Sequence, residues 1–213
     1  KPEEFLCLAS SAAKDFTSAL GKKDVPKVGV VGEIYVKYND FAHKNVVKWL
    51  VSQGVEPVLP AITNFFISFF ANTEARIKDN IHDRKTPKFV LDFAERYIFE
   101  IIRKMEDAIS QFPDIMPIES PHKEAKKASR IINTNSQFGE GWGIAGEFAR
   151  FAEEGINNVV SLQPFGCIAN QIVSKGIEKR TKELYPDLNM LFLDFDNGMS
   201  DVNIYNRLHF IIG

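Results

Sequence analysis

Lys27-Val28-Gly29-Val30-Val31-Gly32 is a short, almost wholly apolar stretch that ends in glycine. Such a stretch is typical of a strand that is covered on both faces of a parallel sheet. Segments of similar length follow at 56–59, 158–163 and 189–194. Helical patterns separate these segments at the spacing of right-handed crossover units, which predicts a parallel sheet.

The expected fold class is α/β, with a Rossmann-like open parallel sheet of about four strands in the order 2-1-3-4 and helices on both faces. Pro57 lies in the second segment. Because proline has no N–H to donate to a central ladder, we expect this strand at an edge of the sheet.

The predicted helices surround these strands within a single domain, residues 1–213. Apolar residues at helical spacing predict an opening helix at 3–20, and Asn39 or Asp40 is expected to cap a helix that closes at Gly54. A helical insertion is expected at about 61–135. The last predicted helices follow at 142–155, 167–184 and 201–210. The chain begins with Lys1 rather than Met and shows no leader, so we expect a fragment of a longer chain.

Composition excludes several classes of protein. Lys plus Arg number 26 against 28 Asp plus Glu, giving a net charge of -2, so nucleic acid is not expected as a partner. The apolar runs fall short of the roughly 20 residues that span a bilayer, so no membrane is expected. Two cysteines, Cys7 and Cys167, form no disulfide framework and favour a cytoplasmic location; Cys7 is expected in the core.

Ligands of open parallel sheets bind outside the carboxyl ends of the strands, where the strand order reverses. This rule selects the following residues: Gly32, Glu33, Ile34 and Tyr35 after the first strand, Gly166 and Cys167 after the third, and Asp194, Asp196 and Asn197 after the fourth. Because the first and third strands are expected to be neighbours, Glu33 and Cys167 should face one crevice.

Cys167 has the most reactive side chain of the residues at this edge. At the start of a helix, unpaired N–H groups and the helix dipole favour a thiolate, which binds metal or attacks an electrophile. A small buried cysteine that fills a strand–helix corner remains an equally weighted alternative. For Asp194 and Asp196, ligand binding and capping of the following turn also remain open.

The segment from Gly141 to Gly146 fits the G-x-G-x-x-G pattern of dinucleotide-binding proteins. That motif requires a strand directly before it and an acidic residue at the end of the next strand. Both are lacking here, so nicotinamide or flavin binding through this segment is not expected. The chain has no P-loop, and no serine lies in a nucleophile elbow.

Four motifs occur together in order: 31–39 (Val-Gly-Glu-Ile-Tyr-Val-Lys-Tyr-Asn), 139–142 (Gly-Glu-Gly-Trp), 163–167 (Gln-Pro-Phe-Gly-Cys), and 194–196 followed by 203–207. In this set the chain resembles the 2-hydroxyacyl-CoA dehydratase superfamily. More closely, it looks like the dehydratase-like portion of long multidomain proteins known as CoA-substrate-specific enzyme activases. The resemblance extends from about Pro26 to Arg207 and is weakest in the helical insertion.

The resemblance implies a [4Fe-4S] cluster, held by cysteines from more than one domain, into which an ATPase activase drives an electron. Cys167 matches a cysteine ligand of the family, and Glu33, Gly141 and Trp142 match positions near the crevice. No other cysteine lies in a suitable loop, whereas a cube needs several thiolates. We therefore expect the isolated chain to hold no cluster and to be inactive, with the other ligands in an upstream domain.

Three hypotheses follow. In the first, the chain contributes Cys167 and one wall of an iron–sulfur site in a dehydratase-like or reductase-like enzyme. In the second, it is a non-catalytic docking or regulatory module between activase and partner domains. In the third, it binds acyl-CoA, with Lys37, Lys175 and Arg207 gathered on the CoA phosphates.

Overall fold

A parallel four-stranded sheet lies at the centre of the computed structural model, which describes residues 2–21, 24–81, 86–113, 115–167, 171–196, 198 and 200–212. The strands are β1 (Lys27–Gly32), β2 (Glu56–Val58), β3 (Asn158–Pro164) and β4 (Asn189–Phe195). Their order is β2-β1-β3-β4, and all three pairs are parallel. The predicted α/β fold, strand order and edge position of the second strand are confirmed.

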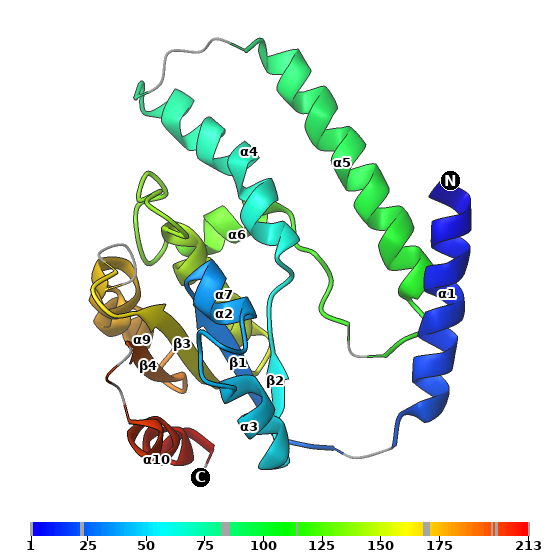
Figure 1. Ribbon diagram of the computed structural model, residues 1–213. Coiled ribbons are helices and arrows are strands. Elements are labelled where there is room, and N and C mark those ends of the chain that lie inside the picture. Colours follow the sequence, from blue (N-terminus) through cyan, green and yellow to red (C-terminus); the bar gives the residue numbers. More distant parts are fainter. Residues whose placement is uncertain are drawn as a thin grey trace.

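Helices cover both faces of the sheet (Figure 1). On one face lie α7 (Trp142–Glu153), α6 (Pro121–Ala128), α9 (Glu178–Leu184) and the start of the insertion. On the other face lie α2 (Ile34–Tyr38), α3 (Val46–Ser52) and α10 (Asp201–Ile212). Val28 and Val30 point to the second face and Val31 to the first, so β1 is apolar on both sides.

Two long helices project from this body (Figure 1). They are α4 (Thr63–Lys78) and α5 (Lys88–Ile109). The opening helix, α1 (Pro2–Ala19), packs along α5 and lies away from the sheet. The rings of Phe16 and Phe112 contact edge to face near the end of α5, with their centroids 6.5 Å apart. Because α1 packs against little else, Cys7 is exposed, and its predicted place in the core is wrong.

The chain between β1 and β2 differs from the prediction. The helix expected from Asn39 or Asp40 begins only at Val46, because the side chain of Asn39 accepts hydrogen bonds from the amides of Phe41 and Ala42 and holds a turn instead. Phe41 is consequently exposed. The short helix α2, which starts directly after β1, was not predicted because it is too short to show a period.

The predicted continuous helix after β3 is also interrupted. A π-helical turn, η1 (Gln171–Lys175), precedes α9, and residues 168–170 lie outside the described part of the chain. Within the described ranges, every helix is too short or too polar to cross a bilayer.

Candidate functional site

The carboxyl ends of β1 and β3 lie at the same edge of the sheet. Their register continues past β1, since the amide of Glu33 donates to the carbonyl of Leu162 at 2.9 Å. The edge extends to β4, where the amide of Phe165 donates to the carbonyl of Phe195 at 2.8 Å. Glu33, Cys167 and Asp194 are therefore aligned along one edge, as the strand order requires.

Gly32 allows β1 to leave the sheet in close contact with β3. Its φ is +118°, and a Cβ at this position would lie 2.0 Å from the carbonyl oxygen of Leu162. Any side chain would push the two strands apart or force the turn open. Gly32 is a structural requirement of the edge.

Glu33 caps the short helix α2. Its Oε2 accepts a hydrogen bond of 2.8 Å from the amide of Val36, so one of the two carboxylate oxygens is engaged in capping α2. Tyr35, in the first turn of α2, is exposed. The neighbouring amide of Ile34 donates to Glu140 Oε1 at 2.8 Å, which joins the start of α2 to the loop before α7.

The loop before α7 brings Gly141 and Trp142 to the same region. Gly141 has a φ of +50°, and a Cβ there would lie 2.1 Å from the carbonyl oxygen of Ser136. Trp142 is buried, and its indole N–H donates to Asn72 Oδ1 at 2.6 Å. Trp142 therefore ties α7 to α4 from within the protein and presents no open ring surface to the crevice.

Cys167 follows β3 in a half-buried position. Its amide donates to the carbonyl of Pro164 at 3.2 Å, and its carbonyl accepts from the amide of Gln171 at 2.9 Å. Gly166, with a φ of +77°, has open space where a Cβ would lie. Cys167 is thus neither fully buried nor fully exposed, and the reading as a small cysteine that fills a strand–helix corner stays an alternative to that of a ligand.

The two aspartates after β4 have different partners. Asp194 accepts from Gln163 Nε2 at 2.6 Å and from Lys175 Nζ at 2.5 Å, so both of its oxygens are engaged. Asp196 accepts from the amide of Gly198 at 2.9 Å and so caps the following turn. Of the two readings that the sequence left open, capping describes Asp196; Asn197 lies outside the described residues.

The three cations considered for the CoA phosphates are engaged separately. Lys37 pairs with Glu147, Lys175 pairs with Asp194, and Arg207 donates to the carbonyl of Phe192 at 2.8 Å. A phosphate would have to replace an existing partner at each of them.

A buried ion pair lies next to this edge, between α2 and α7. Lys37 Nζ donates to Glu147 Oε1 at 2.7 Å, and both residues are buried. Burial alone would lower the pKa of Lys37, but the negative charge of Glu147, helped by Tyr38 and Glu140, outweighs burial and raises it. Lys37 is therefore held as a cation.

Glu124, on α6, packs against the same cluster. Burial, followed by the negative charge of Glu147, raises the pKa of Glu124 to about 8. At neutral pH its carboxyl is therefore mostly protonated and able to donate a hydrogen bond. A Cβ at Gly146 would lie 2.7 Å from Glu124 Cγ, so glycine at this position of α7 makes room for the acid.

Two oxygens of this cluster lack a partner. Asn64 Oδ1 and Glu147 Oε2 are buried without a hydrogen bond. Both residues line a cavity of about 30 Å³ together with Lys37, Glu124 and Glu140. The space suits about one water molecule, which would supply the two missing donors. The cluster thus combines a cation, a carboxylate and a neutral acid around one small polar cavity.

Sequence reasoning missed Glu124 and Glu147. The sequence held one signal for Glu147, which is its place between Ile144 and Phe148 in a mostly apolar helix. Residues 144–151 of α7 are all buried. A charge in such a segment requires a buried partner. That partner, Lys37, is 110 residues away in the sequence, in a helix that was not predicted.

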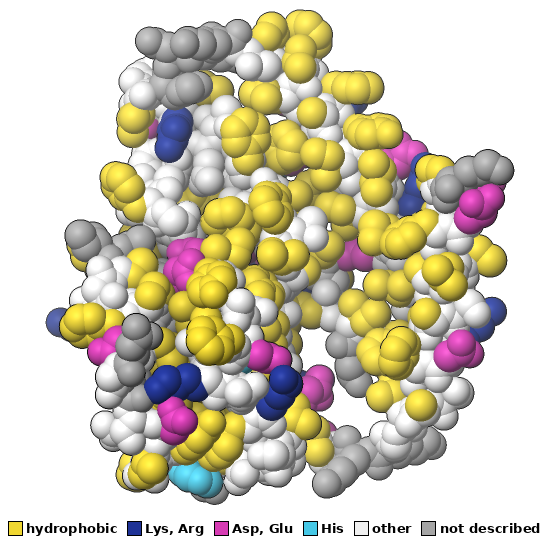
Figure 2. All heavy atoms as spheres, in the orientation of Figure 1, with side chains coloured by type: hydrophobic (Ala, Val, Ile, Leu, Met, Phe, Trp, Pro, Cys, Tyr) yellow, Lys and Arg dark blue, Asp and Glu magenta, His cyan; other side chains and the backbone are white. Residues whose placement is uncertain are grey.

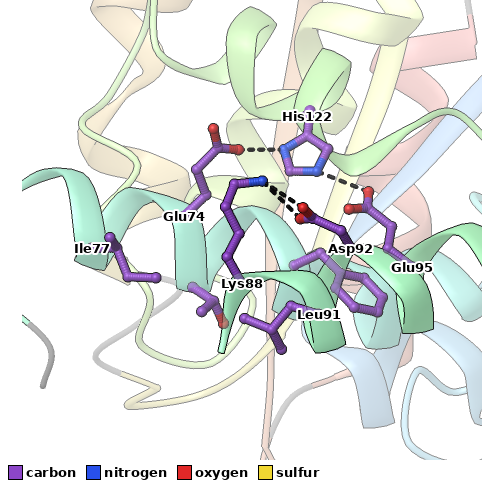
Figure 3. A pocket seen from close by; sticks show the side chains of 9 residues that line it. Glu74, Ile77, Lys88, Leu91, Asp92, Glu95 and His122 are labelled. Atoms are coloured by element: carbon purple, nitrogen blue, oxygen red, sulfur yellow. Dashed lines mark hydrogen bonds and ion pairs between the residues drawn. The ribbon is translucent and has the colours of Figure 1, made fainter. Parts of the chain in front are cut away.

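A larger cavity of about 390 Å³ lies in the insertion, between α4, α5 and the start of α6 (Figure 3). His122 lies between two carboxylates, with Nδ1 2.7 Å from Glu74 and Nε2 2.8 Å from Glu95. Lys88 and Asp92, which also line the cavity, pair along α5 at 2.8 Å. The charged groups that line this cavity pair with one another, and His122 joins α6 to α4 and α5.

Among the described residues, no three His, Cys, Asp or Glu side chains are grouped so as to hold a metal ion. The edge of the sheet offers the Cys167 thiol, while Cys7 is on α1. These residues fit a contribution of one ligand to a [4Fe-4S] cluster and do not fit a complete cluster site. No protein-family model, curated protein or solved structure matches this chain significantly.

Proposed function

We propose that this chain forms one wall of an iron–sulfur site in a dehydratase-like enzyme, with Cys167 as one thiolate ligand of a [4Fe-4S] cluster. The observation that carries the proposal is the position of Cys167, a half-buried thiol at the carboxyl edge of β3. Ligands of open parallel sheets bind at this edge. The cluster type and its use in ATP-driven electron transfer come from the resemblance of the four motifs.

The proposal requires further thiolates from another domain or a partner protein. A cube is held by several cysteines, and Cys167 supplies one. A ligand at the open rim of a domain, with space beside Gly166, suits a cluster that is shared across a domain boundary. When bound, the cluster would supply one-electron chemistry, while this chain supplies one ligand and a rigid wall.

The remaining groups of the edge would shape that wall. Glu33 fixes the start of α2, and the Lys37–Glu147 pair holds α2 against α7. Glu124 keeps a proton close to this pair at neutral pH. We assign these residues the positioning of the crevice and give them no catalytic step.

Anaerobic reconstitution of the full-length protein with iron and sulfide tests the ligand assignment. Cys167→Ser should lower cluster content and shift the visible and EPR spectra, because one thiolate is replaced by a weaker oxygen ligand. Cys7→Ser is the matched control, since Cys7 is exposed on α1, and should leave content and spectra unchanged. Equal cluster content and identical spectra in Cys167→Ser and wild type would refute the assignment. A pure docking module, the alternative, requires no role for Cys167 and predicts that result.

A further inference from the structure

The cavity in the insertion has the size and the walls of a pocket for a small organic molecule. Its volume is about 390 Å³, and ligand pockets of proteins begin at roughly 300 Å³. Phe70 and Ile77 of α4 and Leu91 of α5 contribute apolar side chains to its lining. In Figure 2, hydrophobic side chains gather over the two helices that Figure 1 labels α4 and α5. The hydrocarbon part of a ligand would therefore leave water on entering this cavity.

The charges of the cavity favour a cation over an anion. Its lining includes three carboxylates, which belong to Glu74, Asp92 and Glu95. Among the described residues that line it, Lys88 and His122 are the two that can be positively charged. At least one negative charge is thus left over, and it attracts a positively charged ligand and repels an acid.

Two carboxylate oxygens of the cavity are available to a ligand. His122 contacts Glu74 through Oε2 and Glu95 through Oε1. Neither Glu74 Oε1 nor Glu95 Oε2 accepts a hydrogen bond from a described residue. Both oxygens of Asp92, by contrast, accept from Lys88 Nζ at 2.8 Å. A ligand would gain most from Glu95, because its side chain is 23% exposed against 69% for Glu74.

Charged and apolar residues lie at different levels of the cavity. Ile77 follows Glu74 by three residues on α4, and Leu91 precedes Glu95 by four on α5. Each step is one helical turn, or about 5 Å along the axis. Because α4 and α5 run in opposite directions, both steps lead toward the same end of the helix pair (Figure 1). In Figure 3, Glu74 and Glu95 lie beside His122, while Ile77 and Leu91 lie apart from it. A ligand with a polar head and a short apolar body would match both levels at once.

A primary ammonium group meets the requirements of the charged level. It has three N–H donors and no acceptor, as the two free carboxylate oxygens require. Its hydrogen bonds to carboxylates are charge-assisted and therefore stronger than those of a neutral hydroxyl group. An alcohol lacks the charge, a carboxylate has the wrong sign, and a quaternary ammonium has no N–H to donate.

We propose that the cavity binds a primary organic ammonium ion, whose N–H groups donate to Glu95 and Glu74 and whose short hydrocarbon body lies against Ile77 and Leu91. Cys167 is not among the residues that line the cavity, so binding here does not depend on an iron–sulfur cluster.

NMR titration of the 15N-labelled 213-residue chain at pH 7 tests this site, with n-hexylammonium as the probe. Hexylammonium should bind at least about 10-fold more tightly than methylammonium, which lacks the apolar body, because burial of its methylene groups favours binding. It should also bind at least about 10-fold more tightly than hexanol, which lacks the charge, and than hexanoate. The shifted amides should lie in α4 and α5, within 70–77 and 88–95.

Glu95→Gln keeps the shape of the side chain and removes its charge. It should weaken hexylammonium binding at least about 10-fold and leave hexanol binding nearly unchanged. Leu91→Ala, which shortens the apolar wall, should reduce the preference for hexylammonium over methylammonium. Glu100→Gln is the matched control, since Glu100 pairs with Lys104 on the same helix outside the cavity, and it should bind like wild type. Circular dichroism should show wild-type helix content in all three variants.

Absence of hexylammonium binding up to about 10 mM, where a ligand of this size should occupy a preformed pocket, would overturn the proposal. So would equal affinities for hexylammonium and hexanoate, an affinity that Glu95→Gln does not lower, or a loss as large in Glu100→Gln as in Glu95→Gln. Shift changes confined to elements other than α4, α5 and α6 would also contradict it.

Discussion

Lys37 on α2 donates a hydrogen bond of 2.7 Å to Glu147 on α7, and both side chains are withdrawn from solvent. The pair joins the element that follows β1 to the helix that covers the first face of the sheet. It therefore links the rim of the proposed site to the core.

Removing one member of this pair should lower the free energy of unfolding far more than removing both. Lys37→Met leaves Glu147 buried with an uncompensated charge, and we expect a loss of about 3–5 kcal/mol in the free energy of unfolding. The double variant Lys37→Met/Glu147→Leu should recover most of that loss. Urea denaturation measures both. Lys104→Met, which breaks the exposed pair with Glu100 on α5, is the control and should have little effect. A double variant no more stable than Lys37→Met would contradict the account.

Glu124 should make the protein less stable as pH rises. Its pKa is about 8 in the folded state and about 4.5 as an isolated group, so between these values the folded state keeps a proton that the unfolded state has lost. The contribution of Glu124 to the free energy of unfolding is complete below about pH 4.5. It declines as the pH rises to about 8, by an amount on the order of 5 kcal/mol. Glu124→Gln, which is uncharged throughout, should remove this decline.

The measurement is the free energy of unfolding from pH 5 to about pH 9 for wild type and Glu124→Gln. Glu100→Gln, at an exposed position on α5, is the control and should keep the wild-type slope. Parallel curves for wild type and Glu124→Gln would show that Glu124 is ionised in the folded protein.

Replacement by alanine should destabilise the protein at Gly32 but not at Gly143, although both glycines lie near the edge of the sheet. Gly32→Ala places a Cβ 2.0 Å from a backbone carbonyl at a φ of +118°, and we expect a loss of more than about 2 kcal/mol. Gly143→Ala, in the first turn of α7, meets nothing within 4 Å and should be neutral or slightly stabilising. Thermal unfolding compares them. A Gly32→Ala variant as stable as Gly143→Ala would mean that β1 and β3 are not in such close contact.

His122 should control local rather than global stability. It contacts Glu74 on α4 and Glu95 on α5 from the start of α6, so His122→Ala should increase hydrogen exchange in α4 and α5 while the amides of β1 and β3 stay protected. His209→Ala, which removes a ring contact with Trp49, is the control and should leave exchange in α4 and α5 unchanged. Faster exchange of the strands in His122→Ala would contradict this local role.

The sheet was predictable because its evidence is local. Strands β1, β3 and β4 are short, mostly apolar runs between turn residues, and Pro57 marks β2 as the edge strand. The rim residues followed from strand order, since parallel strands place their carboxyl ends at one edge. Glu33 and Cys167 could therefore be named without coordinates.

The buried cluster of Lys37, Glu124 and Glu147 was not predictable, because its members lie far apart in the sequence. Lys37 lies in a five-residue helix whose start depends on the Glu33 cap, and its partner Glu147 is 110 residues away. The turn at Asn39 replaced a helix because one side chain accepts two amides, a competition that apolar spacing does not record. Burial of Glu124 likewise depends on the small size of Gly146 in another helix.

Thiol protection in the full-length protein tests the central claim most directly. The protein is alkylated anaerobically with iodoacetamide before and after reconstitution with iron and sulfide, and modification of each cysteine is quantified by mass spectrometry. We expect Cys7 to be modified in both states and Cys167 only in the cluster-free state. Equal modification of Cys167 in both states, in a preparation shown to contain the cluster, would contradict its role as a ligand.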